Sequence, residues 1–482
     1  MNTIASKQQN GFVPRRSIFD NYNVTQLIQA YLDENDEDGL MIFLDIEKAF
    51  DSVSWDYMIR AMQACNVGPQ FRKWVEMMYN PNDPPRRRMR INNEKGEWFH
   101  LQASVAQGCP CSALFFVFIT EAFTRAVAHD KDIYKDKGLR GIDINKIQLI
   151  ISQFADDTTL FLSGWDQLPR MWELLDEWAE ATGLTCNIKK TEGLRCGRLR
   201  NSMSSHSSAT GIQWVKPGEW IRTLGFPIGE DFNMEDFLLD RYFRMKRMLV
   251  TWGRKVALEL SIYGRAMIAN SLIYSRFRYY AMVIALPKAI NEAIESDVQA
   301  LIWNKDLQFD AEELGSELNN RPMLSDASMH KKKYQLGLGL ISWPAHVKAL
   351  QARLLFNYND ASTGEYKHVL DCWFARTKEG RGAIFTCYRI KDLIQSNTGR
   401  ASCLPKIFIQ ALQHVRTLTM TPVHPTEVNS REEGLAEPLW GSWRIDMKGV
   451  INRNFWQTKM DTNRVGDTIN FKTGMHYTDQ DI

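Results

Sequence analysis

The feature that most constrains this chain is an uninterrupted apolar run, Gly39–Leu44, that ends directly at the carboxylate Asp45. Such a run is typical of a buried β-strand, and Asp45 then lies at the carboxyl end of that strand. A helix is predicted next, because apolar residues recur at the i, i+3, i+4 and i+7 positions, namely Trp55, Met58, Ile59 and Met62. Ser54 is a suitable N-cap for this helix, and Gly68 lies just past its expected end.

The next residues continue this alternation of short strands and helices. One hairpin is predicted over residues 86–101, and a second joins Ile147–Phe154 to Thr159–Leu162 with Ala155-Asp156-Asp157 at its tip. The remaining predicted elements are two helices, over about residues 112–129 and 166–183. This order predicts an α+β fold in which an antiparallel sheet has helices packed on one face.

Charge is distributed unevenly along the 482 residues. The chain carries 59 Lys and Arg against 57 Asp and Glu, so its net charge of +2 does not point to a polyanionic partner. Residues 241–280, in contrast, hold nine basic residues and one acidic residue, a local charge of +8, with aromatic residues interleaved. This pattern is typical of a nucleic-acid groove. A solvated helix face with core aromatics is the alternative interpretation.

Composition excludes several classes of protein. A hydrophobic share of 44% is that of a globular protein and excludes a disordered or collagen-like chain. The eight cysteines include no CxxC pair, which argues against a zinc site. No signal peptide opens the chain, and the longest apolar run, Ala113–Ile119, is far shorter than the ~20 residues of a membrane span. We therefore expect an intracellular protein of the nucleus or cytoplasm, neither secreted nor bound to a membrane.

Three carboxylates are the strongest candidates for chemistry: Asp45, Asp156 and Asp157. Each follows a predicted strand, and adjacent strands would bring them together. Converging carboxylates supply the hard oxygen ligands that Mg²⁺ prefers, and two such ions can stabilise the attacking and leaving oxygens of a phosphoryl transfer. For an Asp-Asp pair considered alone, an exposed turn is the alternative.

These carboxylates belong to an ordered series of six short motifs. The series runs Gln9–Asn21 (QNGFVPRRSIFDN), Leu44–Val53 (LDIEKAFDSV), Ala106–Ser112 (AQGCPCS), Phe154–Asp157 (FADD), Gly183–Thr191 (GLTCNIKKT) and Leu224–Gly229 (LGFPIG). In content and order it resembles the reverse transcriptases of non-LTR (long interspersed) retrotransposons. The resemblance extends over about residues 8–360, because a later group is also similar: Tyr263-Gly264-Arg265, Leu286-Pro287, Ile302-Trp303 and Gly337-Leu338-Gly339.

The resemblance implies a right-hand polymerase fold in three parts. Residues 1–230 would form partial fingers and a palm, residues 231–360 a helical thumb, and residues 361–482 a mostly helical region of unknown role. The implied activity is that of an RNA-directed DNA polymerase, which adds deoxynucleotides to a primer 3′-hydroxyl on an RNA template.

The resemblance also assigns the metal and acid roles. Asp45, Asp156, Asp157 and the backbone carbonyl of Ile46 would hold two Mg²⁺ ions, or Mn²⁺ in their place. Lys190 would protonate the pyrophosphate leaving group. A lysine that contacts phosphate or faces solvent is the alternative for this residue.

Four residues would line the nucleotide site: Arg16, Phe50, Gln107 and Gly108. Arg16 would contact phosphates. Phe50, five residues after Asp45, would exclude a ribose 2′-hydroxyl, with an ordinary core phenylalanine as the alternative. Gly108 would permit close approach of the backbone.

Primer and template would contact a further set of residues: Leu224, Gly225, Arg254, Lys255 and Arg265. The arginine-rich strand Arg86–Arg90 would grip the template backbone. An exposed strand edge that its charges keep soluble is the alternative for this segment.

The sequence also departs from the family pattern. Arg15 replaces the usual Gly and Ala106 the usual Arg, and other usual residues are replaced by Ser104, Cys111 and Ala113. The chain starts within the first motif, so we expect an N-terminally truncated element that lacks the upstream finger segment. A catalytically inactive remnant that only binds nucleic acid is therefore the second functional hypothesis. A nucleotidyl cyclase is disfavoured, because a cyclase needs no primer grip.

Overall fold

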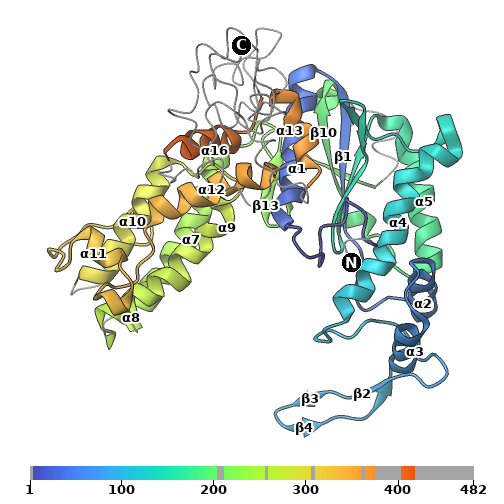
Figure 1. Ribbon diagram of the computed structural model, residues 1–482, viewed down its shortest axis with the longest axis horizontal. Helices are drawn as coiled ribbons and strands as arrows, with labels where there is room; N and C mark the ends of the chain where they lie inside the picture. The colour runs from blue at the N-terminus through green and yellow to red at the C-terminus, as the bar shows by residue number, and fades with distance from the viewer. Residues whose placement is uncertain are drawn as a thin grey trace, which may run out of the picture. The chain divides into compact units, whose positions relative to one another are not determined.

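The computed structural model describes residues 4–202, 211–255, 259–304, 310–359, 364–374 and 403–417 (Figure 1). The chain forms two compact units, Met1–Met234 with Ala361–Val369 (the N-terminal unit) and Glu235–Asp360 with Leu370–Ile482 (the C-terminal unit). The segment Ala361–Val369 thus returns to the N-terminal unit. Most of the region predicted to form a third part, 361–482, lies outside the described residues.

A five-stranded sheet organises the N-terminal unit. Its order is β11 (Gln213–Trp214), β10 (Glu192–Gly197), β1 (Asp38–Leu44), β9 (Asp157–Leu162) and β8 (Ile151–Phe154). The central strand β1 is antiparallel to both neighbours, β8 is antiparallel to β9, and β10 and β11 run parallel. The predicted strand at Gly39–Leu44 is confirmed, and it is the centre of the sheet.

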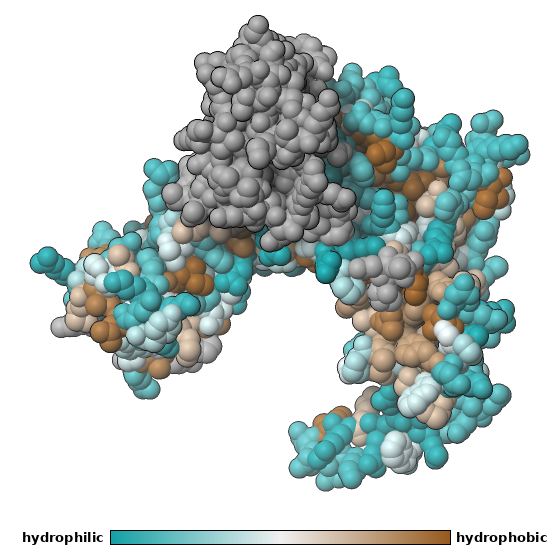
Figure 2. Space-filling view, viewed as in Figure 1, coloured by the Kyte–Doolittle hydropathy of each residue, from teal (hydrophilic) through white to brown (hydrophobic). Residues whose placement is uncertain are grey.

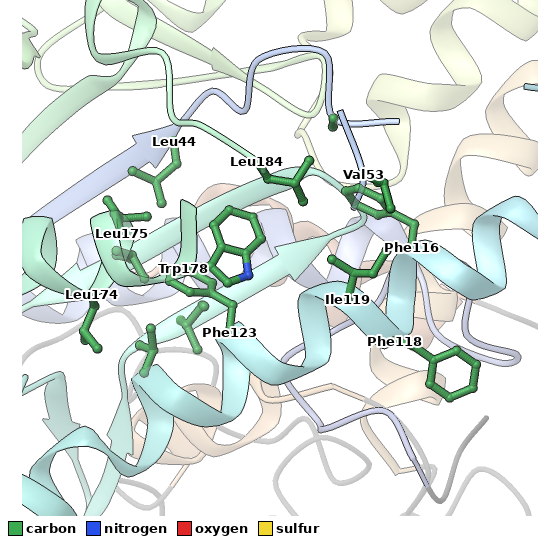
Figure 3. Packing of buried hydrophobic residues seen from close by; sticks show 14 of the residues in the cluster. Leu44, Val53, Phe116, Phe118, Ile119, Phe123, Leu174, Leu175, Trp178 and Leu184 are labelled. Atoms are coloured by element: carbon green, nitrogen blue, oxygen red, sulfur yellow. The ribbon is translucent and has the colours of Figure 1, made fainter. Parts of the chain in front are cut away.

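One face of this sheet carries most of the helices. These are α2 (Trp55–Ala64), α3 (Pro69–Met78), α4 (Ser112–Tyr134) and α5 (Leu168–Thr182). Their apolar side chains form one core with Leu40, Ile42 and Leu44 of β1. Figure 3 shows Trp178 of α5 inside this core, where its ring centroid lies 4.8 Å from that of Phe123 in α4.

The opposite face is covered as well. Side chains alternate along a strand, so Met41 and Phe43 point away from the first core, and both are buried. Helix α1 (Ile18–Asn35) packs here against β8 and β10 (Figure 1). At Gly39 a Cβ would lie 2.3 Å from Cδ1 of Leu32 in α1. The prediction of helices on one face is therefore wrong, because a strand buried along its whole length needs cover on both faces.

Local signals set the ends of several helices. The Ser54 hydroxyl accepts a hydrogen bond from the Tyr57 N–H and caps α2 as predicted, but Gly68 is the N-cap of α3 rather than the stop of α2. Helix α5 ends at Gly183, whose φ of 78° is left-handed.

Helix α4 is longer than predicted. The stretch Ser112–Lys137 is the one helix of the described chain that is long and apolar enough to span a membrane by length and composition. However, 61% of its most apolar window is buried within the protein, including Phe115 and Ile119. The helix is thus a core element of the N-terminal unit.

Short hairpins complete the N-terminal unit. The pairs are β2 (Arg86–Arg87) with β5 (Phe99–His100), β3 (Arg90–Ile91) with β4 (Glu94–Lys95), β6 (Ile142–Ile144) with β7 (Ile147–Leu149), and β12 (Trp220–Thr223) with β13 (Phe226–Gly229). Short 3-10 helices in this unit span Lys135–Lys137, Trp165–Gln167, Ile188–Lys190 and Arg198–Asn201.

The described part of the C-terminal unit is helical. Its elements are α7 (Met234–Lys255), α8 (Ile262–Ile268), a π-helical turn (Ala269–Tyr274), α9 (Ser275–Ala281), α10 (Lys288–Trp303), α11 (Asp326–His330), a 3-10 helix (Lys333–Gln335), α12 (Trp343–Asn359), the end of α13 (Tyr366–Phe374) and α16 (Lys406–Thr417). Stacked rings of Tyr274 and Trp343, 5.1 Å apart, tie the π-helical turn to α12.

Candidate active site

Two adjacent strands bring the three predicted carboxylates to one end of the sheet. Asp45 directly follows β1, and Asp157 is the first residue of β9. The register pairs Leu44 with Thr158, so its next step places Asp45 beside Asp157. Asp156 lies in the two-residue turn between β8 and β9. The three carboxylates thus converge as the sequence predicted.

The electrostatics show the same convergence. Desolvation by the surrounding protein is the largest factor that raises the pKa of Asp157, to about 6, although part of the residue is solvent-exposed. The negative charges of Asp156 and then Asp45 add to this effect. A carboxylate with two like charges beside it is one that a cation would stabilise.

Pairing between two backbone segments places Lys190 beside Asp45. The Asn187 N–H donates to the Asp45 carbonyl at 2.7 Å, and the Glu47 N–H donates to the Thr185 carbonyl at 2.9 Å. The chain then forms the 3-10 helix that ends at Lys190. As a result, Lys190 Nζ lies 3.7 Å from Asp45 Oδ2.

The donor chemistry suits a hard divalent cation, since carboxylate oxygens are the ligands that Mg²⁺ prefers. Within the described ranges, however, no group of three His, Cys, Asp or Glu side chains is already arranged to hold a metal ion. Ile46, whose carbonyl was predicted as a further ligand, pairs with Cys186 just beyond the end of β1. The residues therefore fit the ion by the chemistry of their oxygen donors.

The predicted nucleotide-site residues have mixed surroundings. Phe50 is half-buried and stacks on Phe116 of α4, with ring centroids 4.6 Å apart. Gln107 and Gly108 lie exposed in the turn before α4. No described protein atom lies within 4 Å of a Cβ placed on Gly108, whose φ is +86°. The backbone conformation, rather than contact with the protein, therefore requires glycine there.

Arg16 has a structural role in addition to the predicted one. Its half-buried guanidinium donates to the carbonyls of Ser6, of Gln9 at 2.5 Å and of Ala5 at 3.1 Å. Three of its five N–H donors thus hold the N-terminal segment, and its contact with phosphates stays a prediction.

The predicted primer-contacting turn is a tight hairpin docked on α1. Leu224 and Gly225 have φ of 51° and 86°, as in the two-residue turns that favour hairpins. The Tyr22 hydroxyl donates to the Pro227 carbonyl at 2.8 Å, and the rings of Tyr22 and Phe226 lie 4.7 Å apart. Contacts with Tyr22 of α1 therefore hold this hairpin in place within the N-terminal unit.

The basic segment 241–280 is only partly a charged surface. Lys246 is buried against Asp297, with Nζ 2.7 Å from Oδ1, and the Tyr242 hydroxyl donates to the same carboxylate at 2.6 Å. Arg265 donates to three backbone carbonyls, including that of Asn304 at 2.9 Å, so it has a structural role, and its contact with nucleic acid stays a prediction.

Of the remaining basic residues of this segment, Arg241 is partly buried and lies over the Phe237 ring, and the others divide into two groups. Those exposed in the described structure include Arg244, Arg247, Arg276 and Arg278. Arg254 and Lys255 lie in the last turn of α7, and their side chains are outside the described part. Tyr242 is thus a core aromatic, as in the alternative interpretation, whereas the buried Lys246 fits neither a solvated face nor a nucleic-acid groove.

Two buried residues that reasoning from sequence overlooked support the carboxylate turn. Gln9 and Gly11 open the first motif, in which Arg16 alone had a predicted role. The segment around Gln9 pairs with β8, since the Asn10 N–H donates to the Gln153 carbonyl at 2.8 Å. The motif itself is the sequence signal for these two residues, because it places Gln9 and Gly11 shortly before Arg15 and Arg16.

Comparison with known proteins agrees with this geometry. Residues 1–228 match the family model "Reverse transcriptase (RNA-dependent DNA polymerase)". The "Transposon TX1 uncharacterized 149 kDa protein" of Xenopus laevis is 25% identical over 303 residues, which are 61% of this chain and 22% of that protein. The "Retrovirus-related Pol polyprotein from type-1 retrotransposable element R2" of Nasonia vitripennis is 25% identical over 190 residues, 39% of this chain and 17% of that protein.

The chain therefore spans less than a quarter of the length of these curated relatives. Among solved structures, telomerase from Candida Tropicalis in complex with a telomeric RNA fragment has a TM-score of 0.28 at 13% identity, over 36% of this chain and 29% of that chain. The family model and the two relatives confirm the resemblance stated from the motifs: residues 1–228 are a reverse transcriptase domain related to those of non-LTR retrotransposons.

Proposed function

We propose that this chain is an RNA-directed DNA polymerase that extends a primer 3′-hydroxyl with deoxynucleotides on an RNA template. The observation that carries the proposal is the convergence of Asp45, Asp156, Asp157 and Lys190 at one end of the central strands. In this proposal the N-terminal unit is the palm with partial fingers, and the helical C-terminal unit includes the thumb.

The chemistry follows from the charges at this site. Asp45, Asp156 and Asp157 would hold two Mg²⁺ ions, which supply positive charge to the attacking and leaving oxygens. The primer 3′-oxygen attacks the α-phosphorus of the nucleotide and gives its proton to water. The bond from that phosphorus to the bridging oxygen breaks, and pyrophosphate leaves with a proton from Lys190, which solvent then restores.

Lys190 is well placed for this step. Its ammonium group lies beside Asp45 and is largely exposed, with 69% of the side chain accessible, so it can turn toward a bound triphosphate. An exposed Lys–Asp pair contributes little to stability, so exchanging this partner for a substrate phosphate costs little.

A primer-extension assay with the purified full chain tests the proposal. A labelled DNA primer on an RNA template should be extended only when Mg²⁺ or Mn²⁺ and deoxynucleoside triphosphates are all present. Salt-sensitive binding of the primer–template without extension under any metal would reject it and would support an inactive remnant that binds nucleic acid.

A further inference from the structure

The turn that carries Asp156 is held from outside the sheet by the buried side chain of Gln9. Gln9 is 0% exposed, and its Oε1 atom accepts the Gly11 N–H at 2.7 Å and the Ala155 N–H at 3.1 Å. Its Nε2 atom donates to Thr120 Oγ1 of α4 at 3.2 Å. One side chain therefore connects the turn, the N-terminal segment and the core helix.

Gly11 brings the two backbones into direct contact. A Cβ at Gly11 would lie 2.2 Å from the Ala155 nitrogen and 2.9 Å from its Cα, so no other residue fits without moving the turn. Ala155 has a φ of 59°, in the left-handed region that a residue with a side chain rarely adopts. The contacts from Gln9 and Gly11 keep Ala155 in this conformation.

We propose that Gln9 and Gly11 are positioning residues that fix the backbone of the Ala155–Asp156 turn and so place Asp156 and Asp157 for metal binding. This inference rests on the proposed polymerase function. The contacts of both residues with the turn are contacts within the protein. Their effect runs through one backbone hydrogen bond and one backbone contact with the turn.

The test compares Gln9→Met, which keeps the side-chain volume and removes both acceptor contacts, with Gln26→Met as a matched control. Gln26 is a part-buried glutamine of α1 that bonds Asn23 and does not touch the turn. Two measurements report on the turn directly. One is hydrogen exchange over residues 152–158, and the other is Mn²⁺ binding without any other ligand, followed by electron paramagnetic resonance. Only Gln9→Met should speed exchange at Ala155 and weaken Mn²⁺ binding at least fivefold.

The catalytic readouts then separate positioning from general loss of fold. Gln9→Met should lower kcat at least tenfold with primer–template affinity and active-site titre unchanged, and Gln9→Glu, which retains an acceptor, should restore part of the rate. If Gln9→Met does not fold, Thr120→Val, which removes the link from Gln9 to α4 together with the hydroxyl's bonds to the Phe116 and Val117 carbonyls of that helix, should give the same changes at smaller size. Unchanged exchange and Mn²⁺ binding in the folded variant would overturn the inference, whereas a wild-type chain without extension would reject only the polymerase function.

A second, independent observation concerns the ribbon of residues 84–101, formed by strands β2 to β5. Every residue from Arg86 to His100 is exposed. Four large apolar side chains remain uncovered, with exposed fractions of 65% for Met89, 66% for Ile91, 59% for Trp98 and 44% for Phe99. In the view of Figure 2 this arm is largely hydrophilic, with a small hydrophobic area near its tip.

The charge of the ribbon indicates what would cover these side chains. Four arginines and one lysine outnumber two glutamates, and the Arg88 guanidinium lies 4.5 Å from the Trp98 ring centroid. A single-stranded nucleic acid offers both complements, phosphates for the arginines and base faces for the exposed indole. We infer that the ribbon binds a single strand through Trp98 and Arg88.

Binding of 20-nucleotide U and dT homopolymers to the full chain, without nucleotides, tests this inference. Trp98→Ala should weaken binding by about 5- to 100-fold. The control Trp74→Ala, which removes an equally exposed indole on α3 (65%), should leave it unchanged. Arg86→Gln should lower the salt slope by about 0.7. Comparison of the U and dT homopolymers distinguishes an RNA strand from a DNA strand. Equal affinities of Trp98→Ala and Trp74→Ala for both homopolymers would overturn the inference that Trp98 binds the strand.

Discussion

Lys190 Nζ lies 3.7 Å from Asp45 Oδ2, so the candidate proton donor and the first candidate metal ligand are neighbours. The two residues are 145 positions apart, and the contact exists because the segment 185–187 pairs with the backbone just after β1. Binding of a cation at Asp45 would replace this ion pair and release Lys190 toward the triphosphate.

Replacing Lys190 should slow chemistry specifically. Lys190→Met is expected to lower the rate of single-nucleotide incorporation by about 10²–10³-fold, because a general acid contributes on that scale. Lys189→Met, one residue earlier and also exposed, is the matched control and should change the rate little. Rapid-quench kinetics measure both, and equal rates for the two variants would show that Lys190 is not the acid.

Phe50 should influence which sugar is accepted. Because its ring is half-buried on Phe116, Phe50→Val is expected to lower the free energy of unfolding by about 1–3 kcal/mol. It should also raise incorporation of ribonucleotides relative to deoxynucleotides by at least about tenfold, since the volume beside the 2′-hydroxyl would increase.

The control for this prediction is Phe116→Leu. It alters the fully buried ring beneath Phe50 and should lower stability without a comparable change in sugar selectivity. If the two variants change selectivity alike, Phe50 is simply a core residue and the steric role is wrong.

The stability of the N-terminal unit should depend on pH through Glu365. Burial raises the pKa of this carboxyl from 4.5 to about 7, while the nearby charges of Lys7 and Arg16 and the hydrogen bond from Gln8 oppose the increase. Between these two pKa values the folded chain keeps a proton that the unfolded chain has lost. The free energy of unfolding therefore falls as pH rises from about 4.5 to about 7.

Glu365→Gln removes this titration and keeps an acceptor for the Gln8 amide. It should stabilise the protein by roughly 1–3 kcal/mol at pH 8 and by almost nothing at pH 4.5. Urea unfolding at the two pH values measures the difference, and a gain of the same size at both would exclude the carboxyl as its source.

Local patterns were sufficient to predict the elements that carry the carboxylates. The apolar run before Asp45 and the hairpin before Asp157 each encode a strand in a few consecutive residues, and Ser54 caps its helix by a contact three residues away. Motif order then indicated that these strands meet. Convergence of the carboxylates was predictable because it follows from strand pairing rather than from side-chain detail.

Contacts between distant segments were not predictable in the same way. Gln9 and Ala155 lie 146 residues apart, and no local pattern in either segment encodes their hydrogen bond. In the sequence, Arg265 and Lys246 belong to a basic segment. In the structure, Arg265 donates to backbone carbonyls and Lys246 pairs with Asp297. Whether a basic side chain faces solvent or an internal acceptor depends on tertiary packing, which composition does not record.

In the proposed function, the carboxylates beside the paired ends of β1 and β9 perform divalent-metal-dependent primer extension. The most direct measurement compares extension and primer–template binding for the wild-type chain, Asp156→Asn and the exposed control Asp143→Asn. We predict that Asp156→Asn abolishes extension, that it binds primer–template within about twofold of wild type because it leaves phosphate contacts in place, and that Asp143→Asn behaves as wild type. Extension by Asp156→Asn at the wild-type rate would contradict the account.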